Sequence, residues 1–180
     1  MTERHPMALL AEYSVTASPD RRVVEVYDAD AYLGDQAAMA AAEVQVVAGN
    51  GYHLYLLSRQ PDIDVKVTVR IWDTPPEPPA DAEGHVPVSI ESETGILVVN
   101  QLTMGPAGQM TLPRPGVYEG YAWWSGREAA SAYYDEILKS ITDDWSLEQI
   151  QHAWDQCPAD ERYVLDLAFT RESEPDDEDD

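Results

Sequence analysis

The stretch IDVKVTVRIW, residues 63–72, decides the fold class of this chain of 180 residues. Apolar residues stand at every second position from Ile63 to Ile71, and polar or charged residues alternate with them. Side chains of a strand point alternately to its two faces, so one face is predicted to meet a core and the other to meet water. One buried and one solvated face is typical of antiparallel sheets.

The same period of two recurs along most of the chain. Further candidate strands are LAEYSVT (10–16), RVVEVYD (22–28), HVPVSIES (85–92), ILVVN (96–100) and RYVLDLAFT (162–170). The turn residues ASPDR (17–21) predict that the first two strands form a hairpin. Asn50–Gly51 lies between EVQVVAG (43–49) and YHLYLLS (52–58) and predicts a second hairpin, because this dipeptide favours tight turns between antiparallel strands.

The stretch TLPRPGVYEGYAWW (111–124) combines a turn with a strand. Its prolines fix φ, and Gly116 permits backbone angles closed to other residues, so PRPG predicts a stiff turn. The alternation that follows predicts an inner strand with aromatic side chains anchored in the core. The alternative is an exposed aromatic platform of Tyr121, Trp123 and Trp124, as in a carbohydrate-binding module.

After Trp124 the apolar spacing becomes that of helices. SGRE (125–128) predicts a capping box with Ser125 as the N-cap, and SLEQ (146–149) predicts another. Apolar residues at helical spacing follow each of them, and Pro158 is expected to end the second helix.

Together these patterns predict a mainly β fold. Its expected form is an antiparallel β-sandwich of roughly ten strands with a two-helix insertion, at about 125–157, near the C-terminus. We expect helices only in that insertion. Residues 1–170 are predicted to form this single domain, and residues 171–180 a disordered acidic tail.

The charge balance is strongly acidic, with 34 Asp and Glu against 11 Lys and Arg and a net charge of −23. Seven of these acids lie from Glu172 onward, so the rest of the chain still carries 27 acids against 11 bases, or −16. Such a surface repels nucleic acid and anionic membranes and attracts basic proteins. The alternative is that the acidity only keeps the chain in solution.

Three features bear on where the protein resides. Its single cysteine, Cys157, excludes an internal disulfide, and no stretch approaches the about 18 apolar residues of a membrane span. The apolar run at residues 7–11 is too short for a signal peptide. We therefore expect a cytoplasmic protein.

The common catalytic and metal-binding motifs are missing from the sequence. His152 and Cys157 lie five residues apart, but no second pair completes a zinc site. Cys157 has no basic neighbours to activate its thiol, which favours a structural cysteine over a nucleophile. Asp62 and Asp64 would suit a glycosidase pair, but a solvated sheet face carries such residues equally. We predict no enzymatic activity, no metal and no cofactor.

Several segments, in order, resemble the competence protein J family. YSVT followed by VEVYD, then HLYLLSR, HVPVSIESETGILV with Gly95 at its turn, MTLPRPGVYEGYAWW and ADERYVLDLAFT are similar to the elements of that family. The resemblance covers about two-thirds of the chain and implies a small β-rich inhibitor of a DNA-entry nuclease. The helical pair, the proline-rich acidic loop and the acidic tail depart from the family.

Charge and resemblance lead to one functional prediction. We expect a non-enzymatic interaction protein, nuclease-inhibitor-like or immunity-like, that binds a basic protein partner such as a nuclease or toxin. The expected partner-binding residues lie on the loop DTPPEPPADAEG (73–84) and at the acidic turn after it: Glu77, Asp81, Glu83, Glu91 and Glu93. The alternatives are a carbohydrate-binding type of β-sandwich and a protein without an inhibitor role.

Overall fold

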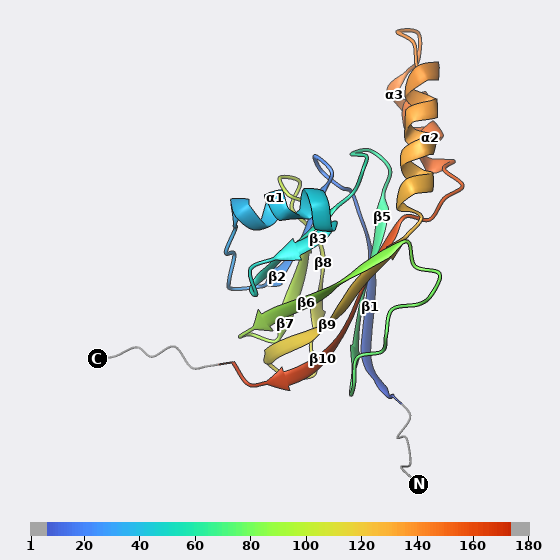
Figure 1. Ribbon diagram of the computed structural model, residues 1–180. Helices are drawn as coiled ribbons and strands as arrows, with labels where there is room; N and C mark the ends of the chain where they lie inside the picture. Colours follow the sequence, from blue (N-terminus) through green and yellow to red (C-terminus); the bar gives the residue numbers. More distant parts are fainter. Residues whose placement is uncertain (1–6, 174–180) are drawn as a thin grey trace.

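The computed structural model describes residues 7–173 and shows a mainly β protein with two sheets and three helices (Figure 1). Sheet A consists, in order, of β1 (Leu9–Ala17), β5 (Val65–Trp72), β10 (Arg162–Arg171), β9 (Gly116–Ser125) and β6 (Gly84–Ser92). Sheet B consists, in order, of β3 (Val47–Gly49), β4 (His53–Leu57), β2 (Val23–Asp28), β7 (Ile96–Asn100) and β8 (Pro106–Thr111). The helices are α1 (Gln36–Gln45), α2 (Arg127–Ser140) and α3 (Leu147–Asp155).

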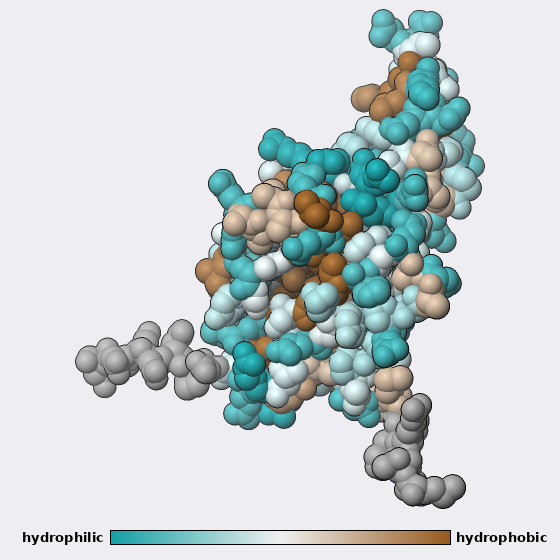
Figure 2. Space-filling model, viewed as in Figure 1, coloured by the Kyte–Doolittle hydropathy of each residue, from teal (hydrophilic) through white to brown (hydrophobic). Residues whose placement is uncertain are grey.

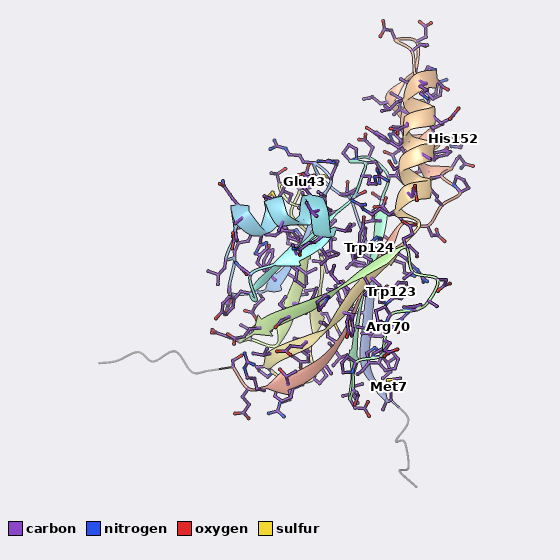
Figure 3. The ribbon with its side chains drawn as sticks, in the orientation of Figure 1. Met7, Glu43, Arg70, Trp123, Trp124 and His152 are labelled. Atoms are coloured by element: carbon purple, nitrogen blue, oxygen red, sulfur yellow. The ribbon has the colours of Figure 1, made fainter. Side chains whose placement is uncertain are left out.

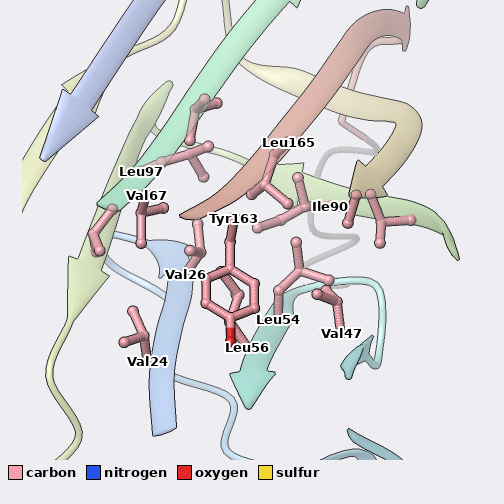
Figure 4. Close-up of a cluster of buried hydrophobic side chains, with 14 of the residues drawn as sticks. Val24, Val26, Val47, Leu54, Leu56, Val67, Ile90, Leu97, Tyr163 and Leu165 are labelled. Atoms are coloured by element: carbon pink, nitrogen blue, oxygen red, sulfur yellow. The ribbon is translucent and has the colours of Figure 1, made fainter. Parts of the chain in front are cut away.

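The two sheets pack face to face around one main core. The alternating stretch 63–72 forms β5, whose inner residues Val65, Val67, Val69 and Ile71 are at most 1% exposed. They share a cluster with buried side chains of β2, β4 and β7 from sheet B, and Figure 4 shows Val67 together with Val26, Leu54 and Leu97 of that cluster. Burying one such side chain contributes about 1.5–3 kcal/mol. The arrangement is sandwich-like, as the alternation predicted.

One neighbouring pair is parallel, so the sheets are mainly, but not entirely, antiparallel. β10 runs parallel to β5, from Arg162 opposite Lys66 to Ala168 opposite Trp72. The other paired strands are antiparallel. Alternation within a strand predicts which face is buried but carries no information on the direction of a partner far away in the chain.

The hairpin expected between the first two strands is wrong. β1 pairs with β5 in sheet A, whereas β2 pairs with β4 and β7 in sheet B. Residues 17–21 therefore carry the chain from one sheet to the other. Turn residues predict a reversal of direction, but they do not decide whether the next strand pairs within the same sheet.

Helix α1 replaces part of an expected strand, so helices are not confined to residues 125–157. Asp35 caps it by accepting hydrogen bonds from the backbone N–H groups of Ala37 and Ala38, at 2.9 and 3.1 Å. The alanine-rich sequence of residues 36–42 favours helix and extends it through Gln45. Ala38 and Ala42 pack on the outer face of sheet B.

What remains of that expected strand is β3, three residues long. It pairs antiparallel with β4 across Asn50 and Gly51, which confirms the second hairpin. Gly51 has a φ of +94°, and the Asn50 side chain accepts hydrogen bonds from the N–H groups of Tyr52 and His53. These are the backbone and side-chain features for which the Asn-Gly turn is favoured.

Helices α2 and α3 lie between β9 and β10 and project beyond the sheets (Figure 1). Ser146 and Gln149 form the expected capping box. Ser125 is not the N-cap of α2: Gly126 takes that position with a φ of +73°, and a Cβ there would collide with the carbonyl oxygen of Asp160. That the pair is an insertion into a sandwich stays a prediction. Among residues 7–173, no helix is long and apolar enough to span a membrane.

The limits of the domain stay predictions as well. β10 ends at Arg171, one residue beyond the expected boundary. Residues 174–180, most of the predicted tail, lie outside the described residues.

Asp28, at the end of β2, holds the turn between β6 and β7. Its carboxylate accepts hydrogen bonds from the Ser92 hydroxyl, from the N–H and hydroxyl of Thr94, and from the N–H of Asp30. Asp28 is 1% exposed. Burial raises its pKa, but the hydrogen bonds from Ser92 and Thr94 outweigh burial and leave the pKa below its ordinary value.

Asp28→Asn is expected to lower the free energy of unfolding by about 1–3 kcal/mol at neutral pH, because an amide cannot accept all of these hydrogen bonds. The contribution of the ionised carboxylate is complete above the ordinary pKa of about 3.9 and is lost as the pH falls through the lower folded value. Urea unfolding should therefore show a difference between variant and wild type that shrinks in acid. Asp30→Asn, at an exposed position, is the control. A difference that is the same at every pH would contradict this account.

Candidate protein-interaction surface

The proline-rich loop between β5 and β6 presents three of the predicted partner-binding acids. Glu77, Asp81 and Glu83 are all exposed. The loop is tied at both ends, since Asp73 exchanges hydrogen bonds with Ala8 and the N–H of Glu83 donates to the Trp124 carbonyl at 2.9 Å. Prolines stiffen the segment between these ties. The loop therefore holds its acids in a restricted arrangement.

Glu83 has a second role that the sequence did not suggest. Its Oε2 accepts a hydrogen bond from the N–H of Glu128 at 3.2 Å, in the first turn of α2. The N-cap residue of this helix, Gly126, has no side chain to perform that task. A carboxylate near a helix N-terminus is also favoured by the helix dipole. Glu83 thus connects the acidic loop to the base of the helical pair.

The other two predicted acids lie elsewhere. Glu91 is half-buried in β6, with its N–H donating to the Gly51 carbonyl at 2.7 Å, and Glu93 is exposed in the turn that follows. Glu83 and Glu91 stand at opposite ends of β6, roughly 27 Å apart along an extended strand. The five predicted residues therefore form two separate groups and not one site.

The three candidate platform aromatics do not form an exposed surface. Trp123 is 4% and Trp124 8% exposed, and as neighbours in β9 they point to opposite faces of the strand. Figure 3 locates both residues on β9. Trp124 belongs to the core between the sheets. The Trp123 indole donates to Asp166 at 2.8 Å, and Trp72 donates to the same carboxylate at 2.9 Å. The prediction of an inner strand with aromatic anchors is confirmed.

A cleft of about 590 Å³ lies on the outer face of sheet A, beside the start of the acidic loop. Its lining includes Asp73, Pro75, Pro87, Glu119 and Tyr121. Tyr121 is half-buried, and the Glu119 carboxylate lies 3.9 Å from the guanidinium of Arg171. The cleft has the acidic and aromatic side chains that suit a basic group, but Glu119 already has a cation beside it.

The most chemically distinctive cluster is a pair that the sequence analysis did not identify. Glu25 and His53 are both 0% exposed, with Glu25 Oε2 and His53 Nε2 2.5 Å apart. Asn100 donates to the other oxygen of Glu25 at 3.0 Å, while His53 Nδ1 has no hydrogen-bond partner. The pair lies on the outer face of sheet B, and adjacent strands place its members together.

Three tyrosines surround this pair. The rings of Tyr27, Tyr32 and Tyr55 lie 4.6–5.0 Å from the His53 ring. Burial raises the pKa of all three phenols, and the negative charge of Glu25 raises each of them further. Full burial separates Glu25 and His53 from any substrate, so this arrangement stabilises the outer layer of sheet B instead of forming an accessible catalytic pair.

The other residues considered as catalytic or metal-binding candidates take part in local contacts within the fold. Asp62 accepts a hydrogen bond from the Tyr134 hydroxyl at 2.9 Å, and burial, together with Asp155, raises the pKa of Asp64. The half-buried Cys157 thiol lies 3.6 Å from the Ala159 carbonyl oxygen. Across residues 7–173, no group of three His, Cys, Asp or Glu side chains is arranged to hold a metal ion.

Comparison with known proteins relates the chain to others by fold. No protein family model matches the sequence, and no curated protein matches it. The crystal structure of ComJ, inhibitor of the DNA degrading activity of NucA, from Bacillus subtilis, is similar with a TM-score of 0.57 at 12% identity, over 92% of this chain and 100% of that one. A protein described as crocagin biosynthetic gene J has a TM-score of 0.49 at 17% identity, over 93% of this chain and 100% of its own. At these identities the ComJ match shows a shared fold and not family membership.

Glu25→Ala is expected to lower the free energy of unfolding by about 3–5 kcal/mol, because it leaves His53 and Asn100 buried without their shared partner. Denaturant unfolding measures this loss. Asp81→Ala, at an exposed acid of the loop 73–84, is the control and should stay within about 0.5 kcal/mol of wild type. Equal effects of the two substitutions would show that the buried pair adds nothing to stability.

Glu83→Ala is expected to weaken the first turn of α2 by about 0.5–2 kcal/mol, since the N–H of Glu128 loses its acceptor. Glu83→Gln should have a smaller effect, because the amide oxygen still accepts. Hydrogen exchange of the α2 amides measures both. If Asp81→Ala, on the same loop, accelerated exchange as much as Glu83→Ala, the capping role would be wrong.

Proposed function

We propose that this chain is a non-enzymatic interaction protein that inhibits a nuclease or toxin by binding its basic surface. The observation that carries the proposal is the shared fold with a protein described as an inhibitor of a DNA-degrading activity, over 92% of this chain. The net charge of −23 supports it independently. Nucleases contact phosphates through basic surfaces, so an acidic protein is attracted to the same surface as the substrate. We place this activity in the cytoplasm.

The proposed contacts are the five acids predicted from the sequence. Glu77, Asp81 and Glu83 suit this role best, because the loop that carries them is stiffened by prolines and tied at both ends. Less ordering entropy is then lost on binding. Glu91 and Glu93, at the far end of β6, form a second and separate acidic group. No observation on the described residues favours the carbohydrate-binding alternative, since Trp123 and Trp124 are buried.

The proposal is tested by titrating the purified chain into DNA-degradation assays of non-specific nucleases encoded in the same genome. Inhibition should be stoichiometric, and association should slow as salt shortens the Debye length from about 10 Å at 0.1 M to about 3 Å at 1 M. The triple variant Glu77→Gln, Asp81→Asn and Glu83→Gln should reduce the association rate before it changes dissociation.

The matched control is Glu12→Gln, Asp30→Asn and Glu43→Gln, which removes the same charge from exposed positions elsewhere. It should change the association rate less than the loop variant does. Failure of the wild-type chain to inhibit any such nuclease would contradict the proposed function. Inhibition that is unchanged in the loop variant would keep the function and exclude the loop as its contact.

A further inference from the structure

The helical arm, defined as residues 127–155, exposes large apolar side chains far from the core. Leu138 is 46% and Leu147 85% exposed, and Ile141 and Trp145 are half-buried between them in the sequence. Figure 2 shows hydrophobic side chains gathered towards the free end of the arm. We call these four residues the arm patch. Single exposed leucines are common, but a group of large apolar residues at the end of a projecting element marks an interaction surface.

A hollow of about 600 Å³ lies beside Trp145. It follows α3 and is lined by Trp145, Ser146, Glu148, Gln149, His152 and Ala153. Trp145 belongs to both the hollow and the patch, and Figure 3 locates His152 on the arm. The lining residues on α3 share one face of that helix, and Leu147 lies on the opposite face, so the hollow is separate from the exposed leucines.

The arm is fastened to the sheets before any partner binds. The Tyr134 ring stacks on Trp154 with centroids 4.9 Å apart, and its hydroxyl donates to Asp62. At the base, Arg127 Nε donates to the Leu57 carbonyl at 3.0 Å. These contacts attach the arm to the end of β4 and to the segment that precedes β5.

The charge of the arm indicates what covers the patch. The arm carries seven acidic and two basic side chains, and Asp143, Asp144 and Glu148 immediately surround Trp145 and Leu147 in the sequence. A second copy of this chain would bring the same acids together and be repelled. A partner segment with apolar side chains among Lys and Arg residues is complementary both to the apolar patch and to the acidic residues around it.

We propose that the arm patch is the docking surface for a basic, amphipathic segment of the partner protein. Apolar side chains of that segment cover Leu138 and Leu147 near the free end of the arm, and its Lys or Arg residues lie against Asp143, Asp144 and Glu148. This inference rests on the proposed function and assigns the main apolar contact to the arm, with the loop acids at its base contributing long-range attraction.

The test uses the full chain and a defined probe. The probe is an amphipathic leucine–lysine peptide of about 18 residues, roughly 27 Å when helical, and its counterpart has glutamate in place of lysine. Calorimetry measures affinity, and amide NMR shifts locate the binding site. The lysine peptide should bind and shift amides of residues 137–153, and the glutamate peptide should not bind.

Leu138→Ser combined with Leu147→Ser should weaken lysine-peptide binding at least tenfold. Because both side chains are largely exposed, the double variant is expected to fold, and circular dichroism checks this. Val44→Ser is the matched control, since Val44 is an exposed apolar residue, 87% accessible, on α1. It should leave the affinity unchanged.

Three results would overturn the inference: equal peptide affinity for the double variant and wild type, amide shifts confined to the loop 73–83 or the sheets, or a wild-type dimer in sedimentation that the double variant abolishes. Nuclease inhibition that the double variant retains in full would likewise exclude the arm while leaving the proposed function intact. A wild-type chain that inhibits no nuclease would count against the proposed function. The peptide measurements would still show whether the arm patch binds a basic amphipathic segment.

Discussion

The pairing of β10 with both β5 and β9 is the interaction on which the rest of the structure depends. Without β10, sheet A would consist of two unconnected pairs, β1 with β5 and β9 with β6. Its inner residues Tyr163, Leu165 and Leu167 are at most 1% exposed and extend the core across this gap. Since α2 and α3 connect β9 to β10, the same pairing also sets where the helical arm leaves the sheets.

Buried carboxylates hold the layers outside the main core in place. Asp166 joins Trp72 to Trp123 on the outer face of sheet A, and Glu25 joins His53 to Asn100 on that of sheet B. At the base of the arm, burial raises the pKa of Glu161, which accepts a hydrogen bond from Tyr163 at 2.6 Å. Burying a carboxylate costs free energy unless hydrogen-bond donors surround it. Each of these carboxylates therefore favours the packing in which the elements that carry its donors lie together.

The proposed function uses the surface that these layers leave outside. A rigid acidic loop and a projecting acidic arm meet at one hydrogen bond, from the Glu128 N–H to the Glu83 carboxylate. In the proposed function, the charge on both elements would attract a basic partner at long range, whereas the apolar end of the arm would act only on contact. Such a division of roles accounts for a strongly acidic protein that nevertheless exposes leucines at the tip of its most prominent element.

The sequence by itself determined most of the strands, their buried faces and the helical pair. Alternation is a local property, and it predicted that Val65, Val67, Val69 and Ile71 are buried. The capping box that begins at Ser146 followed from four adjacent residues. Local patterns also indicated an inner position for Trp123 and Trp124. The order of the segments that resemble the competence protein J family agrees with the similarity between the fold of this chain and that of ComJ.

Only the tertiary structure decided how those elements combine. The parallel pairing of β5 with β10 and the assignment of β1 and β2 to different sheets depend on contacts between distant segments, which alternation does not encode. The Glu25–His53 pair required two strands in register, and the capping role of Glu83 required its loop to reach the start of α2. In each case the sequence shows which side chains can form hydrogen bonds or pack in a core. It does not show which residues they contact, because contacts between distant segments are set by the packing of the folded chain.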